Sequence, residues 1–265
     1  MTKLKDFVPP ILLDKLRENP LRRYGWFGNY ENWEAAEKQS VGYDDNLIID
    51  KVLESTLRVK NGEFPYERDS VLFKEIHYDW PILACLMWVA ARNGGKLNVL
   101  DFGGSLGSTY WQNKKFLQQL QGLTWAIVEQ PRFVELGKKY LEDDFLKFYI
   151  DVETSFNSVI PDVLLLSGVI SYIKEPYLLL DKLFNFKIKN IILERIPLIR
   201  AGKDRLTVQR VPPKIYKASY PAWFFSEDKF FQFVEKHYNI HEIYDCGYKI
   251  NIPSMIKGMV LTLKN

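Results

Sequence analysis

Apolar and polar residues alternate along the chain in a way that predicts strands and helices in turn from residue 79 onward. Short apolar runs bounded by turn residues predict buried strands over 97–102, 123–128, 146–150, 162–167, 190–193, 238–245 and 256–263. Between them, apolar positions at helical spacing predict helices over 79–93, 108–120, 133–141, 176–184 and 227–237, the last capped by Ser226. This order favours an α/β fold with a doubly wound, mostly parallel sheet.

Residues 1–80 do not follow this alternation. Apolar positions over 45–60 predict an amphipathic helix, and Asn32 is placed to cap a short helix that runs to residue 38. We therefore expect a helical, aromatic-rich cap over 1–80 and a main domain over 81–265. Aromatic side chains beside a site can stack on a sugar, although packing of the cap on the sheet is the better explanation for most of them. The aromatic candidates for substrate contact are Tyr24, Trp26, Tyr30 and Tyr43.

A basic insert, which we expect to be irregular, lies at about 197–225. Between Arg195 and Lys217 there are seven basic residues and one acid, Asp204, whereas the whole chain has a net charge of +3. Such a patch attracts a phosphorylated or carboxylated small molecule, unless it is only a solvated loop. Substrate contacts are expected from Arg195, Arg205, Gln209 and Tyr220. The patch is short and no nucleic-acid-binding motif is present, so we expect no nucleic-acid partner.

Composition narrows the class of protein further. Hydrophobic residues make up 47% of the 265 residues, enough for a large core. Two cysteines form no disulfide framework and favour a reducing compartment. No signal-peptide pattern is visible, and the longest apolar run, 81–91, is too short to span a bilayer. We expect a cytoplasmic protein without a metal site.

The stretch over 98–107 joins a predicted strand to a predicted helix through glycines, which is the unit that binds nucleotide-like ligands in parallel sheets. A dinucleotide motif would need glycine at position 102, which is Phe102. A phosphate loop would need a lysine after Gly107, and Ser108 stands there. The remaining pattern, acid-x-glycine-x-small-x-glycine, resembles motif I of class I S-adenosylmethionine (SAM)-dependent methyltransferases, with Ser105 in place of the middle glycine.

Acids follow the next two predicted strands. Glu129 is placed to accept hydrogen bonds from ribose hydroxyls, which SAM and NAD share. In methyltransferases, an acid at the place of Asp151 bonds the adenine, an apolar neighbour such as Val152 packs on it, and the loop after the fourth strand lines the methyl-donor pocket. The resemblance therefore implies cofactor contacts from Asp101, Phe102, Gly103, Gly104, Ser105, Gly107, Glu129, Gln130, Asp151, Val152, Ser167 and Gly168.

The chain as a whole resembles a bacterial family of SAM-dependent methyltransferases found among surface-polysaccharide biosynthesis proteins. The matching stretches lie at 26–30, 42–44, 100–108, 125–130 and 218–221, and the segment 101–107 is the most specific of them. The resemblance implies a seven-stranded Rossmann-like sheet with an antiparallel last strand. It also implies SAM as cofactor and O-methylation of a sugar or other small anionic acceptor, for example a nucleotide-linked sugar.

Methyl transfer to a hydroxyl requires a group that accepts its proton, and the candidates are His77, Glu194 and Asp204. A second hypothesis is a non-catalytic, methyltransferase-like module that binds a nucleotide sugar or a partner enzyme. A third, an NAD-linked oxidoreductase, is disfavoured by Phe102. The sequence predicts neither the methylated atom nor the oligomeric state.

Overall fold

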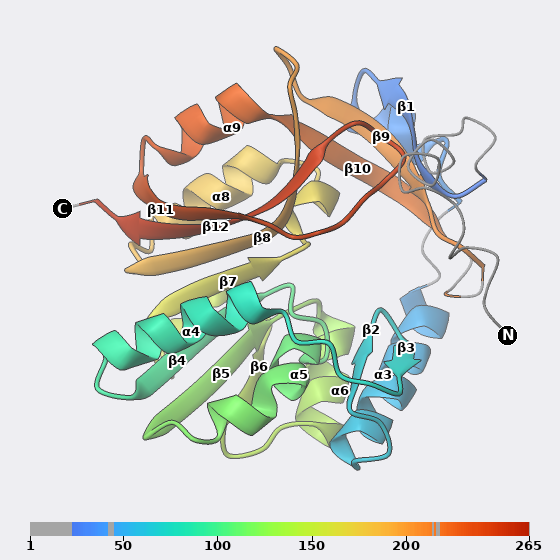
Figure 1. Ribbon diagram of the computed structural model, residues 1–265. Helices are drawn as coiled ribbons and strands as arrows, with labels where there is room; N and C mark the ends of the chain where they lie inside the picture. The colour runs from blue at the N-terminus through green and yellow to red at the C-terminus, as the bar shows by residue number, and fades with distance from the viewer. Residues whose placement is uncertain (1–22, 42–44, 214, 216–217, 265) are drawn as a thin grey trace, which may run out of the picture.

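A ten-stranded sheet forms the centre of the molecule, and its middle is parallel (Figure 1). The computed structural model describes residues 23–41, 45–213, 215 and 218–264. The parallel part has the order β6-β5-β4-β7-β8, and the predicted doubly wound sheet is confirmed. Its strands are β4 (Lys96–Phe102), β5 (Gly122–Val128), β6 (Leu146–Tyr149), β7 (Val163–Ser167) and β8 (Asn190–Ile199).

The last two strands complete the sheet in the way that the resemblance implies. β12 (Met255–Leu263) pairs antiparallel with β8, and β11 (Tyr238–Asp245) pairs antiparallel with β12. The final strand along the chain is therefore inserted between β8 and β11. The fold is a Rossmann-like α/β sheet with mostly parallel strands and an inserted antiparallel strand.

Helices cover both faces of the sheet because its central strands are buried on both sides (Figure 1). Val99 points into one apolar cluster and Leu100 into the other, and both side chains are at most 1% exposed. The first cluster is covered by α3 (Asp45–Lys60), α4 (Trp80–Arg92), α5 (Ser108–Leu117) and α6 (Pro131–Tyr140). The second is covered by α7 (Val152–Phe156), η2 (Ile170–Tyr172), α8 (Pro176–Phe184) and α9 (Glu227–Val234).

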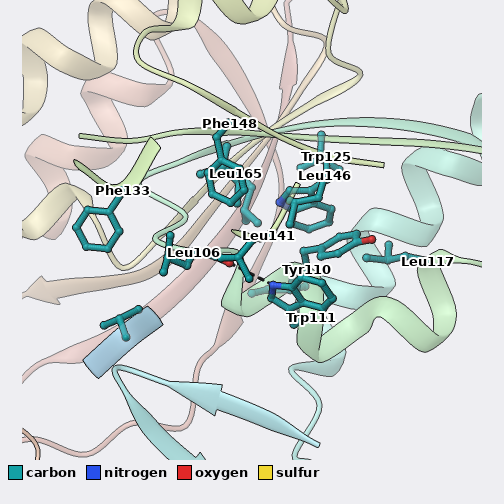
Figure 2. Close-up of a cluster of buried hydrophobic side chains, with 14 of the residues drawn as sticks. Leu106, Tyr110, Trp111, Leu117, Trp125, Phe133, Leu141, Leu146, Phe148 and Leu165 are labelled. Carbon is teal, nitrogen blue, oxygen red and sulfur yellow. Dashed lines mark hydrogen bonds between the residues drawn. The ribbon is translucent and has the colours of Figure 1, made fainter. Parts of the chain in front are cut away.

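Large aromatic side chains fill the core beside α5 (Figure 2). Trp125 and Tyr110 are fully buried, with ring centroids 5.8 Å apart. Trp111 is also buried and donates its indole N–H to the carbonyl of Leu106 at 3.2 Å. This bond ties the first turns of α5 to the loop that precedes it, so the loop rests on a rigid base.

The insert at 197–225 is a β-structure and not the irregular loop that we expected. β8 continues to Ile199, and β9 (Arg205–Arg210) and β10 (Ser219–Ser226) pair antiparallel; the end of β10 also pairs with the end of β8. β1 (Gly25–Tyr30) joins the other edge of β9. The pairing between β1 and β9 connects segments about 180 residues apart, which no local sequence pattern indicates.

The N-terminal part is helical only in part. Asn32 caps α2 (Trp33–Glu37) by accepting the N–H of Ala35 at 2.9 Å, and α3 has the bounds that we predicted. β1 and a hairpin of β2 (Tyr66–Arg68) and β3 (Val71–Phe73) complete this part. The division of the chain at residue 80 stays a prediction. Within the described residues, no helix is long and apolar enough to cross a membrane.

Candidate cofactor site and adjoining cleft

The glycine loop after β4 has the backbone that a close-fitting ligand site needs. Gly103 and Gly107 have φ of 71° and 92°, and a Cβ on Gly103 would lie 2.6 Å from the Val169 side chain. Ser105 also lies in the left-handed region, with φ of 53°. That conformation costs a non-glycine residue on the order of 1–2 kcal/mol, which explains why glycine is usual at the matching place in the motif.

Asp101 supports this loop from below. Its carboxyl is 1% exposed and accepts the indole N–H of Trp125 at 3.0 Å. A Cβ on Gly104 would lie 2.5 Å from the same carboxyl group, so the loop packs directly on it. Burial raises the pKa of Asp101 to about 7, although the Trp125 bond acts in the opposite direction. The side chain therefore contacts the loop and β5, while Gly103, Gly104 and Ser105 keep part of their surface.

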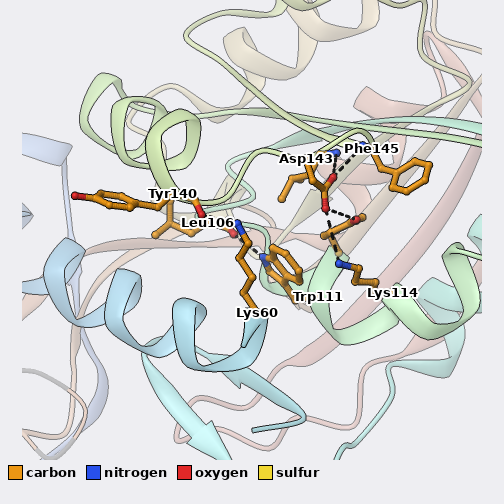
Figure 3. Close-up of polar contacts among 9 residues, drawn as sticks. Lys60, Leu106, Trp111, Lys114, Tyr140, Asp143 and Phe145 are labelled. Carbon is orange, nitrogen blue, oxygen red and sulfur yellow. Dashed lines mark hydrogen bonds and ion pairs between the residues drawn. The ribbon is translucent and has the colours of Figure 1, made fainter. Parts of the chain in front are cut away.

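Polar contacts also fix α5, which follows the loop (Figure 3). Lys114 lies 3.8 Å from the carboxylate of Asp143, which itself accepts the backbone N–H groups of Phe145 and Leu146. On the other side, Lys60 of α3 donates to the carbonyl of Tyr140 at 2.6 Å. These bonds connect α3, α5 and the segment before β6 into one support for the loop.

Glu129 connects the second strand end to the glycine loop. Its Oε1 accepts the N–H of Ser105 at 3.1 Å, and its Oε2 accepts the N–H of Gln130 at 2.8 Å. Burial raises the pKa of Glu129, while the two N–H groups lower it. A carboxylate has about four acceptor positions, so roughly two remain for hydroxyl groups of a ligand. Gln130 is exposed, and its side chain makes no capping hydrogen bond at the start of α6.

Asp151 lies beyond the next strand end and caps α7. Its Oδ1 accepts the N–H of Thr154 at 2.6 Å, and hydrogen bonding to Thr154 lowers the pKa of Asp151. Val152 beside it is 5% exposed and packs in the core. The register pairs Val128 with Phe102 and with Tyr149, so the three strand ends that carry the loop, Glu129 and Asp151 lie side by side.

Arg195, in the middle of β8, contacts the end of β7. Its Nη2 donates to the carbonyl and to the hydroxyl of Ser167, at 2.9 and 3.0 Å. A Cβ on Gly168 would lie 2.9 Å from this guanidinium, so the absent side chain makes room for it. Burial opposes the charge of Arg195, but attraction from Tyr248, Asp69 and Glu194 raises the pKa of its guanidinium. The side chain is therefore a fixed cation next to Ser167.

Glu194 is fully buried beside Arg195. Its carboxyl group accepts hydrogen bonds from the Tyr244 hydroxyl and from the Cys246 thiol. Its Oε1 has no hydrogen-bond partner recorded within the described part of the chain. Burial raises the pKa of Glu194, and the charge of Asp79 raises it further. The carboxyl group favours the protonated form compared with an exposed glutamate.

A cleft of 760 Å³ has in its lining Cys246, whose thiol bonds to Glu194 of β8. It lies between the β2–β3 hairpin, the start of α4, residue Gln112 of α5 and the connection from β11 to β12. Its walls include Tyr66, Phe73, Tyr78, Trp80 and Tyr248, and its polar residues include Arg68, Asp69, His77, Asp79 and Cys246. An apolar cleft with a few converging polar groups is the usual form of a small-molecule site.

The β2–β3 hairpin links the cleft to the glycine loop. Ser108, the first residue of α5, donates its hydroxyl proton to the buried Glu67, and Arg68 donates to Gln112 at 2.8 Å. Gln112 in turn donates to the carbonyl of His77. Burial raises the pKa of Glu67 to about 7. In the hairpin turn, Asp69 and Ser70 have φ of 51° and 64°. Such positive φ values favour glycine, but neither turn position is a glycine here.

Searches against known proteins identify similar structures but no family. No family model and no curated protein matches the chain. The N-terminal domain of EvdMO1, solved in the presence of SAH and D-fucose, is 16% identical; the match covers 84% of this chain and 98% of that one, with a TM-score of 0.49. Magnesium protoporphyrin IX methyltransferase from Synechocystis PCC 6803 with bound SAH is 12% identical, with 81% and 100% covered and a TM-score of 0.49. At these sequence identities and TM-scores, the activity of the similar proteins cannot be assigned to this chain. A functional assignment must therefore rest on the geometry of the site itself.

The structure brings only some of the predicted catalytic and substrate residues to the cleft. His77 lines it, Glu194 lies behind Cys246, and Arg195 bonds to Ser167. Asp204 lines a different cleft, of 690 Å³, with Arg200, Lys203 and Arg205. The basic residues therefore do not form one patch: Arg200, Lys203 and Arg205 line this second cleft, whereas Arg195 contacts the end of β7. Tyr43 lies outside the described residues.

The other substrate candidates build the β1–β9–β10 extension. Trp26 packs edge-on against Phe224, with ring centroids 6.2 Å apart, and Tyr30 packs on the small core that contains Leu206 and Val208. Arg205 donates to the carbonyl of Gly28 at 2.8 Å. Tyr24 is 40% exposed at the start of β1. The remaining two substrate candidates lie opposite each other in the β9–β10 pairing: Gln209 and Tyr220.

Sequence reasoning missed the residues that the hairpin contributes. Glu67, Arg68 and Asp69 lie in a segment for which we predicted no strand, because each strand has only three residues. The pair Asp69-Ser70 between Tyr66 and the apolar stretch 71–73 is the signal that could have indicated a tight hairpin. Asp79 and Tyr248 reach the cleft only through the tertiary arrangement.

Proposed function

We propose that this protein is a SAM-dependent methyltransferase. The observation that carries the proposal is the bond between Ser105 and Glu129, which sets the glycine loop and a ribose-type carboxylate side by side at adjacent strand ends. With Asp151 beyond the third strand end, these groups match an adenosyl ligand from its amino-acid end to its base. We assign the sequence-predicted cofactor residues to this ligand, with Asp101 acting through the loop that it supports.

The residues fit SAM better than a dinucleotide. A dinucleotide fold places its pyrophosphate at the N-terminus of the helix that follows the glycine loop. Here the carboxyl group of Glu67 occupies that end of α5 through its bond with Ser108. With this end of α5 taken by the Glu67 carboxyl group, a pyrophosphate finds no free helix terminus, whereas SAM carries no phosphate. Within the described residues, the loop also has no lysine that could neutralise a phosphate.

When bound, SAM supplies the methyl group as an electrophile, and the chain's own residues hold the acceptor and receive its proton. Of the three proton-acceptor candidates, His77 lies in the cleft and Glu194 lies buried behind it. Asp204 is held by Lys229, Tyr177 and the N–H of Ser226, so it serves the fold of β9 and α9. We therefore favour His77, with Glu194 as the second candidate.

We place the methyl acceptor in the 760 Å³ cleft and propose O-methylation of a sugar. Tyr66 and Phe73 are stacked with centroids 4.6 Å apart, and Tyr78 and Trp80 line the wall beside them. Aromatic faces suit the apolar face of a sugar ring. The described charged residues of the cleft are three acids and Arg68, which favours hydrogen bonding to hydroxyls over binding of phosphate. An anionic part of the acceptor would instead suit Arg200, Lys203 and Arg205 of the second cleft.

A role in bacterial surface-glycan biosynthesis rests on the sequence resemblance alone, and a cytoplasmic location rests on the cysteine content and on the sequence showing no signal-peptide pattern. The test is incubation with methyl-labelled SAM and a panel of free and nucleotide-linked sugars, read by mass spectrometry as a gain of one methyl group. Transfer to a sugar hydroxyl supports the proposal. Tight SAM binding without transfer to any member of the panel favours the non-catalytic binding module.

A further inference from the structure

The strand β8 is interrupted at the point where it reaches the site. In its pairing with β12, Lys257 lies opposite Ile196 but Met259 lies opposite Leu193, so Glu194 and Arg195 together face one residue, Gly258. Arg195 has φ of 61° in this bulge. β-bulges redirect side chains and are common next to active sites, and a left-handed arginine persists only where its surroundings impose it.

The bulge places the guanidinium against the end of β7 and holds it there. Nη2 makes both bonds to Ser167, and Gly168 leaves the space that the group occupies. Nε is shielded from solvent and has no partner among the described residues. The side chain as a whole keeps part of its surface accessible. One edge of the fork is therefore fixed by the protein, and the bonds found in the described structure leave Nη1 for a ligand.

Among the residues that the structure describes, no carboxylate pairs with this cation. Across the described ranges, no acidic oxygen lies within 4.0 Å of the Arg195 nitrogens, although Asp69, Glu194 and Asp101 act on its charge from further away. A partly buried charge without a paired group is costly. The free Nη1 of the guanidinium can donate charge-assisted hydrogen bonds to an anionic oxygen. The missing partner therefore has the chemistry of an anionic group, and a carboxylate satisfies it.

The position of Arg195 indicates which carboxylate this is. Val169, two residues after Ser167, touches the place where a Cβ of Gly103 would lie. The guanidinium thus lies on the β7 side of the glycine loop, at the opposite end of the site from Glu129 and Asp151. We infer that Arg195 binds the α-carboxylate of the amino-acid end of SAM and its product S-adenosylhomocysteine. This inference rests on the proposed function and makes Arg195 a donor-binding residue.

Two ligands separate this inference from the proposed function. S-Adenosylhomocysteine carries the carboxylate, whereas 5′-methylthioadenosine has the same adenosine and sulfur but no amino-acid end. Calorimetric titration of the wild-type full-length protein, Arg195→Lys and Arg195→Gln with both ligands gives six affinities. Arg92→Gln, an exposed arginine on α4, is the matched control.

The expected result is a loss of S-adenosylhomocysteine affinity of roughly 10- to 100-fold in Arg195→Gln, as for loss of hydrogen bonds between charged groups. Arg195→Lys keeps the charge without the fork and shows a smaller loss. Affinity for 5′-methylthioadenosine stays within about twofold of wild type in both variants, which also shows that they fold. If Arg195→Gln binds neither ligand, that variant is taken as misfolded, and the affinities of Arg195→Lys for the two ligands test the inference.

Equal affinity for S-adenosylhomocysteine in wild type and Arg195→Lys, together with an unchanged affinity in any folded Arg195→Gln, would overturn the inference. It would leave the proposed function intact, and the carboxylate partner of Arg195 would then belong to the acceptor. Failure of the wild-type protein to bind either ligand would instead overturn the proposed function.

Discussion

Ser105 and Glu129 are joined by a backbone-to-carboxylate hydrogen bond of 3.1 Å that ties the first strand end of the site to the second. Ser105 holds a left-handed conformation, and the bond stabilises it in that place. The same carboxylate accepts the N–H of Gln130 at 2.8 Å. The shape of the glycine loop and the ribose-type carboxylate are therefore one structural unit, and a change in either is expected to alter both.

Glu129→Gln tests this unit. In this variant an NH₂ group replaces one acceptor oxygen and faces a backbone N–H, so two hydrogen-bond donors oppose each other. The substitution also removes the negative charge that would bind ribose hydroxyls. We expect the affinity for S-adenosylhomocysteine to fall roughly tenfold or more. Affinity for 5′-methylthioadenosine falls in parallel because that ligand carries the ribose, in contrast to the expectation for Arg195 variants. Glu135→Gln on α6, where the side chain is 62% exposed, is the control. Unchanged affinities in Glu129→Gln would show that Glu129 does not bind ribose.

Gly104→Ala tests the packing of the loop on Asp101. The added Cβ would lie 2.5 Å from the carboxyl carbon and from one carboxyl oxygen of a buried side chain. Overpacking of this kind lowers the free energy of unfolding by about 1–3 kcal/mol, measured by urea denaturation. Gly202→Ala is the matched control because no atom lies within 4 Å of its Cβ position. Equal stability of Gly104→Ala and wild type would mean that the loop does not rest on Asp101.

Asp101→Asn tests the buried carboxyl through the pH dependence of stability. Burial raises the pKa of Asp101 from its ordinary 3.8 to about 7, so the folded state binds the proton more tightly than the unfolded state. The stability that this proton contributes is present below about pH 4 and is lost as the pH rises through about 7.

In Asp101→Asn this loss is absent. The free energy of unfolding should therefore decline less between pH 4 and 7 than in wild type, by up to about 1.4 kcal/mol per pH unit. Urea denaturation at several pH values measures it, and Glu67→Gln should behave alike because burial also raises the pKa of Glu67 to about 7. Parallel curves for wild type and Asp101→Asn would contradict a buried, proton-binding Asp101.

Asp204→Ala tests whether this acid serves the fold. Its side chain is 9% exposed and lies 2.5 Å from Lys229, and it accepts the N–H of Ser226 at 2.8 Å. Ser226 itself makes no side-chain cap, so the capping role that we predicted for it was wrong. Asp204, in the loop before β9, instead holds the start of α9 through the Ser226 N–H and Lys229. Loss of these charge-assisted bonds costs about 1–3 kcal/mol, read by chemical denaturation.

S-Adenosylhomocysteine affinity of Asp204→Ala should match wild type, because Asp204 lies in the separate cleft. Asp144→Ala, an exposed acid before β6, is the control for removal of one negative charge. Full stability of Asp204→Ala would reopen its assignment as a proton acceptor for catalysis.

The sequence was sufficient for the central sheet because its strands are marked by composition alone. β7 is a nearly continuous apolar run and β4 is an apolar stretch that ends in the glycine turn, and the predicted bounds of both differ from the observed ones by one residue. The glycine turn and the acids Glu129 and Asp151 could be placed at one sheet edge, since parallel strands end together. The strand order was enough to predict that the glycine turn, Glu129 and Asp151 lie close together, and no knowledge of side-chain positions was needed.

The cleft could not be predicted in the same way. Glu67 and Arg68 lie on a three-residue strand that is stabilised by bonds to α5, and Asp69 lies in the turn after it; such bonds leave no periodic pattern. The aromatic residues Trp26 and Tyr30, which were candidates for ligand contact, pack in the β1–β9–β10 extension. A pattern rich in aromatics indicates burial but does not distinguish a pocket wall from a strand that pairs far along the chain.

Calorimetric titration of the purified, folded protein with S-adenosylhomocysteine, followed by the same titration with NAD⁺, tests the central claim most directly. The account predicts saturable binding of one S-adenosylhomocysteine per chain and no binding of NAD⁺, because Glu67 occupies the α5 terminus that a pyrophosphate would need. Binding of NAD⁺, or no binding of S-adenosylhomocysteine by protein that unfolds cooperatively in urea, would contradict it.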